Sequence, residues 1–186
     1  MSSIATEVAP RTTTTPESIS QTPLRAPARR LRKGTEVSAS LVEVCSVRLG
    51  ENLYGVPITH ILEIVGAARP QPVPLAPPFV GGLVSYRGDV LTTVSLRHLL
   101  GMEPKPGSQD ILVLESVEGC YGLLVDSVSE VLTVSSADFE SNPSILDQRR
   151  KALFAGAYKL KGSLLVMLDP ERLDPIHLSA SQAASS

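Results

Sequence analysis

Residues 80–100 read Val80-Gly-Gly-Leu-Val-Ser-Tyr-Arg-Gly-Asp-Val-Leu-Thr-Thr-Val-Ser-Leu-Arg-His-Leu-Leu100, with one charged turn between two apolar segments. The β-branched residues on both sides of the turn favour pleated strands. A glycine at position 88 permits a positive φ angle, which suits a tight turn between antiparallel strands. The pattern therefore predicts a β-hairpin that turns at Arg87-Gly88, followed by a helical turn that ends near Gly101.

A degraded copy of this hairpin occurs downstream, where Lys161-Gly162 aligns with Arg87-Gly88. The segments that precede the two hairpins also align, with Tyr121-Gly122 falling on Tyr54-Gly55. Each copy contains four or five short strand patterns and no long helical one, which is typical of small β-barrels. We therefore predict an all-β fold with two small barrels, from a first repeat at residues 41–107 and a second at 108–178. Units of this size bury little surface, so we expect the two to pack together over an apolar seam.

The composition of the 186-residue chain is that of a globular protein, with 42% hydrophobic and 19% charged residues. Two cysteines make no disulfide framework, and no apolar run reaches the roughly 20 residues of a membrane span, so a cytoplasmic location is expected. Residues 1–40 are rich in Ser, Thr and Pro, and with residues 179–186 they are predicted to be disordered. Residues 1–40 carry six basic and three acidic side chains, whereas the whole chain has a net charge of −2. The remainder is therefore acidic, which argues against nucleic-acid binding.

A thiol enzyme would use Cys45 or Cys120 as the nucleophile and His60 or His98 as the base. In the repeat alignment each cysteine falls opposite a leucine, which indicates a small apolar strand residue instead. No two histidines have the spacing of metal ligands, and phosphate-binding loops, dinucleotide fingerprints and nucleophile elbows are absent from the sequence. We therefore predict no catalytic residues, no cofactor and no metal.

One ion pair is predicted from the residues. Glu63 lies within the apolar run Ile61-Leu-Glu-Ile-Val65, and a carboxylate in such surroundings needs a cation. Arg87 at the hairpin turn offers a guanidinium with bidentate geometry. We therefore expect Glu63 to pair with Arg87, and a weaker pair of Glu130 with Lys161 in the second repeat. Two independent solvated charges are the alternative.

Three ordered motifs resemble the CheW-like family of chemotaxis coupling proteins, and the resemblance as a whole covers residues 41 to about 178. The central one is Pro74-Leu-Ala-Pro-Pro-Phe-Val-Gly-Gly-Leu-Val-Ser-Tyr-Arg-Gly-Asp-Val-Leu-Thr-Thr-Val-Ser-Leu-Arg-His-Leu-Leu-Gly101. It is preceded by Tyr54-Gly-Val-Pro-Ile-Thr-His-Ile-Leu-Glu-Ile64 and followed by Tyr121-Gly-Leu-Leu-Val-Asp-Ser-Val-Ser-Glu-Val131. The chain departs from the family pattern at Ser85, where the family has Asn, and at Ser95, where it has Asp.

The resemblance implies a non-enzymatic adaptor with two five-stranded SH3-like barrels. Such an adaptor bridges the cytoplasmic tip of a chemoreceptor to the regulatory domain of a histidine kinase, without inserting into the membrane. The receptor helix of the family lies in an apolar groove between the barrels, a common mode of helix recognition. Carried over by position, the groove residues are Cys45, Ile58, Ile61 and Val128. The family's Glu–Arg pair falls on the pair predicted above.

Two other functions stay open at this point. One is a module of the same fold that scaffolds a two-component pathway outside chemotaxis, in motility or gene regulation. The other, a remote alternative, is the thiol enzyme. Cysteine alkylation would abolish the function of a thiol enzyme but leave the partner binding of a scaffold intact.

Overall fold

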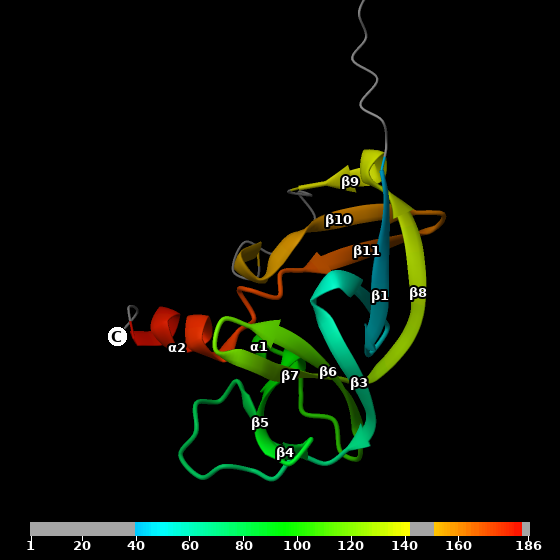
Figure 1. Ribbon diagram of the computed structural model, residues 1–186. Coiled ribbons are helices and arrows are strands. Elements are labelled where there is room, and N and C mark those ends of the chain that lie inside the picture. Colours follow the sequence, from blue (N-terminus) through cyan, green and yellow to red (C-terminus); the bar gives the residue numbers. More distant parts are fainter. Residues whose placement is uncertain (1–39, 142–150, 184–186) are drawn as a thin grey trace, which may run out of the picture. The chain divides into compact units, whose positions relative to one another are not determined.

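The structure is a computed structural model that describes residues 40–141 and 151–183 of the chain, all of them within one unit, Val37–Ser186 (Figure 1). The predicted disordered tail therefore lies outside the described residues, except for Ser40. The strands are β1 (Leu41–Leu49), β2 (Asn52–Pro57), β3 (Ile61–Ala68), β4 (Val80–Tyr86), β5 (Asp89–Ser95), β6 (Gln109–Ser116), β7 (Gly119–Val125), β8 (Ser127–Ser135), β9 (Phe139–Glu140), β10 (Phe154–Leu160) and β11 (Ser163–Leu168). The helices are η1 (Ile58–His60), α1 (Leu96–Leu99), η2 (Ser136–Asp138), η3 (Lys151–Leu153) and α2 (Pro175–Ala183).

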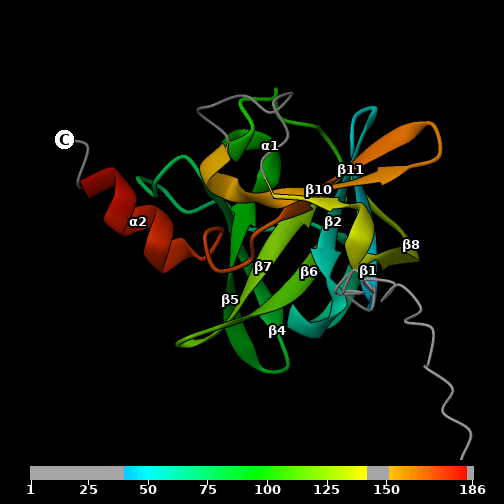
Figure 2. The same cartoon turned by 90° about the horizontal axis from the view of Figure 1, so that it is seen from above.

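The strands form two sheets, which Figures 1 and 2 show from two directions. Sheet A has the strand order β8-β1-β2-β11-β10-β9, and sheet B has the order β3-β6-β7-β5-β4. The predicted all-β fold with short helices is confirmed. Helix α2 is too short to cross a membrane, as is every other helix in the described part of the chain.

The two repeats exchange strands. Sheet A combines β1 and β2 of the first repeat with β8 to β11 of the second, whereas sheet B combines β3 to β5 of the first repeat with β6 and β7 of the second. The exchange is symmetrical, because β2 pairs in parallel with β11 and β7 pairs in parallel with β5. The expectation that each repeat folds into its own barrel is therefore wrong: each unit needs a hairpin from the other copy to complete its sheet.

The Tyr-Gly dipeptide that marks both repeats has a packing role. Tyr54 and Tyr121 are buried between the two sheets, and the Tyr121 hydroxyl donates to the carbonyl of Pro170 at 2.6 Å. A Cβ at Gly55 would lie 2.6 Å from both Met167 and Val44, inside sheet A. A Cβ at Gly122 would lie 2.8 Å from Ile111 and 3.0 Å from Thr93, inside sheet B. The dipeptide therefore places a large ring on one face of the strand and leaves no room for a side chain on the other.

Buried apolar side chains in the described part of the chain form three clusters. Val44 belongs to the cluster inside sheet A, and Leu91 to the cluster inside sheet B. The third cluster, here called the inter-sheet core, lies between the sheets and receives residues from both. It corresponds to the apolar seam expected from the sequence. Its buried members are Cys45, Val47, Leu49, Tyr54, Val56, Phe79, Val94, Leu96, Leu100, Leu112, Leu114, Tyr121, Leu123, Val125, Phe154, Leu168 and Leu173.

The predicted hairpin turns at Arg87-Gly88, with Tyr86 opposite Asp89. Both turn residues have positive φ, 51° for Arg87 and 91° for Gly88, which matches the twist of the flanking strands. The helical turn after it is α1, where the Ser95 hydroxyl accepts from the backbone N–H of His98 at 3.3 Å. Serine thus supplies the same helix cap that an aspartate would.

The C-terminal segment differs from the prediction. Residues 179–183 were expected to be disordered, but they belong to α2. The buried Asp174 carboxylate accepts from the N–H of Ile176 at 2.9 Å and from the hydroxyl of Ser116, and Pro175 is the first helical residue. This start is favourable for a helix, because the carboxylate caps the N-terminus and proline needs no hydrogen bond there. Leu178 then packs against the inter-sheet core.

Candidate functional site

Three of the four predicted groove residues lie at the rim of the inter-sheet core. Ile58 lies in η1, Ile61 is the first residue of β3, and Val128 is near the start of β8; each is partly buried against that core. Cys45 is only 1% exposed and belongs to the core itself. All four therefore belong to the inter-sheet core or pack against it, Cys45 inside it and the other three at its partly buried edge. We call these three the rim residues.

Two of the rim residues, Ile61 and Val128, are held by strand pairing. Ile61 lies opposite Leu114 in the β3–β6 pair, and Val128 lies opposite Val47 in the β1–β8 pair. Asp110 of β6 accepts from the backbone N–H of Val128 at 2.9 Å. The start of β8 is thereby tied to sheet B, although the strand belongs to sheet A.

The edge strands β3 and β8 carry further exposed apolar side chains that sequence reasoning missed. Leu62 and Ile64 on β3 are 53% and 47% exposed, and Val131 on β8 is 52% exposed. Edge strands with exposed large apolar residues are typical of surfaces that receive a partner. The sequence signal is the pair of apolar residues on each side of Glu63, which is more than the alternation of a strand with one buried face requires.

Glu63 and Arg87 are in direct contact. Glu63 Oε2 accepts from Arg87 Nη2 at 2.6 Å and Nε at 3.1 Å, and from the hydroxyl of Tyr86 at 2.8 Å. The Arg87 guanidinium also lies 5.2 Å from the centre of the Tyr86 ring. The hydrogen bonds from Tyr86 and then Arg87 lower the pKa of Glu63 below its usual value. The carboxylate is thus held in its charged form.

This cluster joins the two outer strands of sheet B. Glu63 lies on β3 and Tyr86 on β4, and these strands are at opposite ends of the sheet order. A second link comes from Gln71, which pairs with Leu83 of β4 through two backbone hydrogen bonds of 2.8 Å. Between the two links lies an open pocket of about 430 Å³, with Val65, Val84 and Ile111 among its lining residues. The ion pair therefore closes sheet B on itself.

The predicted second pair does not form. Within residues 40–141 and 151–183, no ion pair joins Glu130 to Lys161. Glu130 lies on β8 at one end of sheet A, whereas Lys161 lies in the β10–β11 turn toward the other end. The neighbouring Lys159 instead contacts Glu140 of the adjacent strand β9, with 3.1 Å between Nζ and Oε2.

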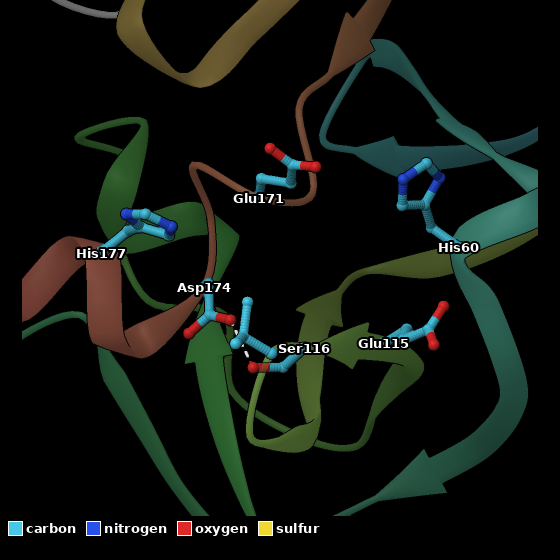
Figure 3. A pocket seen from close by; sticks show the side chains of 7 residues that line it. His60, Glu115, Ser116, Glu171, Asp174 and His177 are labelled. Atoms are coloured by element: carbon cyan, nitrogen blue, oxygen red, sulfur yellow. Dashed lines mark hydrogen bonds between the residues drawn. The ribbon is translucent and has the colours of Figure 1, made fainter.

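A second open pocket, of about 390 Å³, brings together His60 of η1 and His177 of α2 (Figure 3). The two imidazoles lie at opposite ends of the pocket, and Glu171 lies between them. Ser116 donates directly to Asp174, with no histidine between hydroxyl and carboxylate. In the described part of the chain, no three His, Cys, Asp or Glu side chains are placed to hold a metal ion.

The thiols give no nucleophile–base pair either. Cys45 is buried, and burial raises the pKa of its thiol, which disfavours the reactive thiolate. The His60 ring contacts Thr59, with 3.2 Å between Nδ1 and Oγ1. Cys120 lies partly exposed against the cluster inside sheet B, as a small apolar strand residue would. Neither Cys45 nor Cys120 is therefore placed as an activated nucleophile in the described part of the chain.

Comparison with known proteins agrees with this geometry. The model of the CheW-like domain family matches residues 43–175. A chemotaxis protein CheW of Rhizobium meliloti (strain 1021) is 30% identical over 135 residues, which cover 72% of this chain and 87% of that protein. One of Treponema pallidum (strain Nichols) is 26% identical over 137 residues, covering 70% and 81%.

The crystal structure of the scaffolding protein TtCheW from Thermoanaerobacter tengcongensis superposes with a TM-score of 0.65 at 24% identity. The match covers 72% of this chain and 92% of that one, and it shows the same fold. The region matched by the family model, residues 43–175, contains strands of both sheets and every rim residue. The chain therefore belongs to the CheW-like domain family, and its relatives include chemotaxis proteins CheW.

Proposed function

We propose that this protein couples the cytoplasmic tip of a chemoreceptor to the regulatory domain of a histidine kinase, in the cytoplasm at receptor arrays. The observation that carries the proposal is the position of Ile58, Ile61 and Val128 within the family match. These apolar residues come from both sheets and stay partly exposed beside a filled core. An adaptor needs such a surface because it acts by holding two proteins together.

The receptor tip docks as a helix across the rim residues. A helix with an apolar stripe buries side chains at intervals of three and four residues, and the rim supplies branched aliphatic partners for them. The exposed Leu62 and Ile64 of β3 extend the apolar surface along that strand, and Val131 extends it along β8. The surface has no catalytic task, so its affinity comes from burying apolar area.

The closed state of sheet B supports this role. Ile61 lies two residues before Glu63 on β3, and the Glu63–Arg87 contact holds that strand against β4. An edge strand that is tied at both ends presents its side chains in one arrangement, so less conformational entropy is lost when a partner binds. The ion pair is therefore a positioning element of the receptor surface.

The proposal is tested with three purified components: this protein, a receptor cytoplasmic fragment that contains the tip, and the kinase regulatory domain. Calorimetric titration first measures the affinity of this protein for each partner alone. It then measures the affinity for the second partner when the first is already bound. We expect both partners to bind, and to bind at the same time. If neither partner binds, or if one displaces the other, the protein is not a coupling adaptor between them.

A further inference from the structure

A second charged pair, Arg97 with Asp126, is more enclosed than the Glu63 cluster. Arg97 Nε donates to Asp126 Oδ1 at 2.6 Å, and Nη2 donates to Oδ2 at 2.6 Å. The remaining nitrogen, Nη1, donates to the carbonyl of Glu103 at 2.8 Å. The two side chains are 14% and 7% exposed. This bidentate geometry fixes both side chains, and a lysine at position 97 would not reproduce it.

The pair joins segments of both sheets. Arg97 lies in α1, which follows β5 of sheet B, and Asp126 lies where the chain passes from β7 of sheet B to β8 of sheet A. Asp126 Oδ2 accepts from the backbone N–H of Gly50, in the β1–β2 turn of sheet A, at 2.9 Å. The backbone N–H of Asp126 donates to the carbonyl of Arg48 of β1 at 3.1 Å. One carboxylate therefore connects α1, the crossing between the sheets and the β1–β2 turn.

Strand β8 begins immediately after Asp126, and the rim residue Val128 follows two positions later. Ile61, on the other side of the rim, belongs to sheet B. The distance between these two side chains thus depends on how sheet A is held against sheet B. The inter-sheet core resists separation but is apolar, and apolar packing is not directional. The Arg97–Asp126 pair adds a directional contact at this crossing, beside the hydrogen bond from the Val128 N–H to Asp110.

We propose that Arg97 and Asp126 are positioning residues that fix the start of β8, and with it Val128, relative to Ile61. This inference rests on the proposed receptor-binding role of the rim residues. Neither side chain touches the partner. They act by holding β8 in the register and direction that a docked helix requires.

Lys105, a charged neighbour of the Arg97–Asp126 pair, supplies a control because its contact with Asp126 is longer and more exposed. Lys105 also approaches Asp126, but at 3.7 Å, and its side chain is 43% exposed. Surface contacts of this kind contribute little. Replacing Lys105 should therefore leave the position of β8 unchanged, whereas replacing Asp126 should not.

The test measures the position of β8 directly by pulsed electron spin resonance. Spin labels are attached to T59C in η1 and S129C in β8, both at exposed positions, in a C120S background. We expect a single narrow distance distribution for the otherwise unchanged protein and for K105Q. For D126N we expect a broader or displaced distribution. Receptor-fragment affinity, measured on unlabelled proteins, should fall roughly tenfold or more in D126N.

A second variant, R97K, keeps the charge and removes the bidentate fork, so it should broaden the distribution even if D126N folds poorly. The positioning role is overturned if D126N and R97K are folded and give the distribution of K105Q. It is also overturned if the distribution broadens while receptor affinity stays unchanged. Failure of the unmodified protein to bind the receptor fragment would instead refute the proposed function, and the distance measurement would still decide whether the pair fixes β8.

Discussion

Replacing Gly55 by alanine tests the packing that the repeated Tyr-Gly dipeptide produces. The added Cβ would lie 2.6 Å from Met167 Sδ, 2.6 Å from Val44 Cγ1 and 3.3 Å from Leu165 Cδ2. Val44 is β-branched and lies in a central strand of sheet A, so it has little freedom to move. Overpacking of this kind costs about 1–3 kcal/mol of unfolding free energy. At roughly 2–4 °C per kcal/mol, we expect the melting temperature to fall by several degrees.

The assay is urea unfolding followed by far-UV circular dichroism, because the chain has no tryptophan for fluorescence. The matched control is Gly66→Ala in β3, where the nearest atom to the added Cβ is Asp110 Oδ1 at 3.7 Å. We expect the unfolding free energy of the control to lie within about 0.5 kcal/mol of that of the unchanged protein. The dependence of the unfolding free energy on urea concentration should be the same for both. Equal unfolding free energies for the two variants would refute the packing explanation.

Three further predictions concern charge and thiol chemistry. Glu63→Gln and Arg87→Gln should have non-additive effects on unfolding free energy in a double-mutant cycle, and additive effects would show that the two charges are independent. Alkylation of the folded protein should modify Cys120 much faster than Cys45 and leave partner binding intact; rapid modification of Cys45 would contradict its burial. The hydrogen bond from Arg97 lowers the pKa of Asp126 in the folded protein. The charged Asp126 therefore contributes fully to the unfolding free energy above the unfolded pKa of about 3.9, and this contribution is lost as the pH falls through the lower folded pKa. The stability difference between the unchanged protein and Asp126→Asn should therefore be large at pH 7 and shrink below about pH 4, and a difference independent of pH would contradict this.

Local chemistry made the hairpin and the ion pair predictable. The Arg87-Gly88 turn follows from the need for positive φ at two residues between β-branched strands, and the structure has it there. The Glu63–Arg87 pair follows from the need of a carboxylate within an apolar run for a cation, and the structure has the contact at 2.6 Å. The helical turn that ends near Gly101 was predicted for a similar reason, since it depends on capping by nearby residues.

Strand exchange between the repeats was not predictable from the same signals. Periodicity shows which face of a strand is buried, but it does not say which distant strand pairs with it. The β2–β11 pairing joins residues more than a hundred positions apart, and only the folded chain shows it. The Arg97–Asp126 pair was missed for the same reason, because it depends on where the chain crosses between the sheets.

The helix α2 was missed although its start signal was present. Asp174-Pro175 is a favourable pair for a helix N-terminus, but the Ser- and Ala-rich residues that follow resembled a disordered tail in composition. The composition of residues 176–183 indicates only that few large apolar side chains are present. The segment forms a helix because Asp174 caps its start and Leu178 packs against the inter-sheet core.

The most direct test of the central claim, that the rim residues bind the receptor tip, is calorimetric titration of a receptor-tip fragment into Ile61→Glu. The matched control is Val117→Glu, which changes an apolar residue in the β6–β7 turn that is 93% exposed. We expect Ile61→Glu to bind the receptor fragment roughly tenfold or more weakly, and to bind the kinase regulatory domain as the control does. A folded Ile61→Glu variant that binds the receptor fragment as tightly as Val117→Glu would contradict the claim.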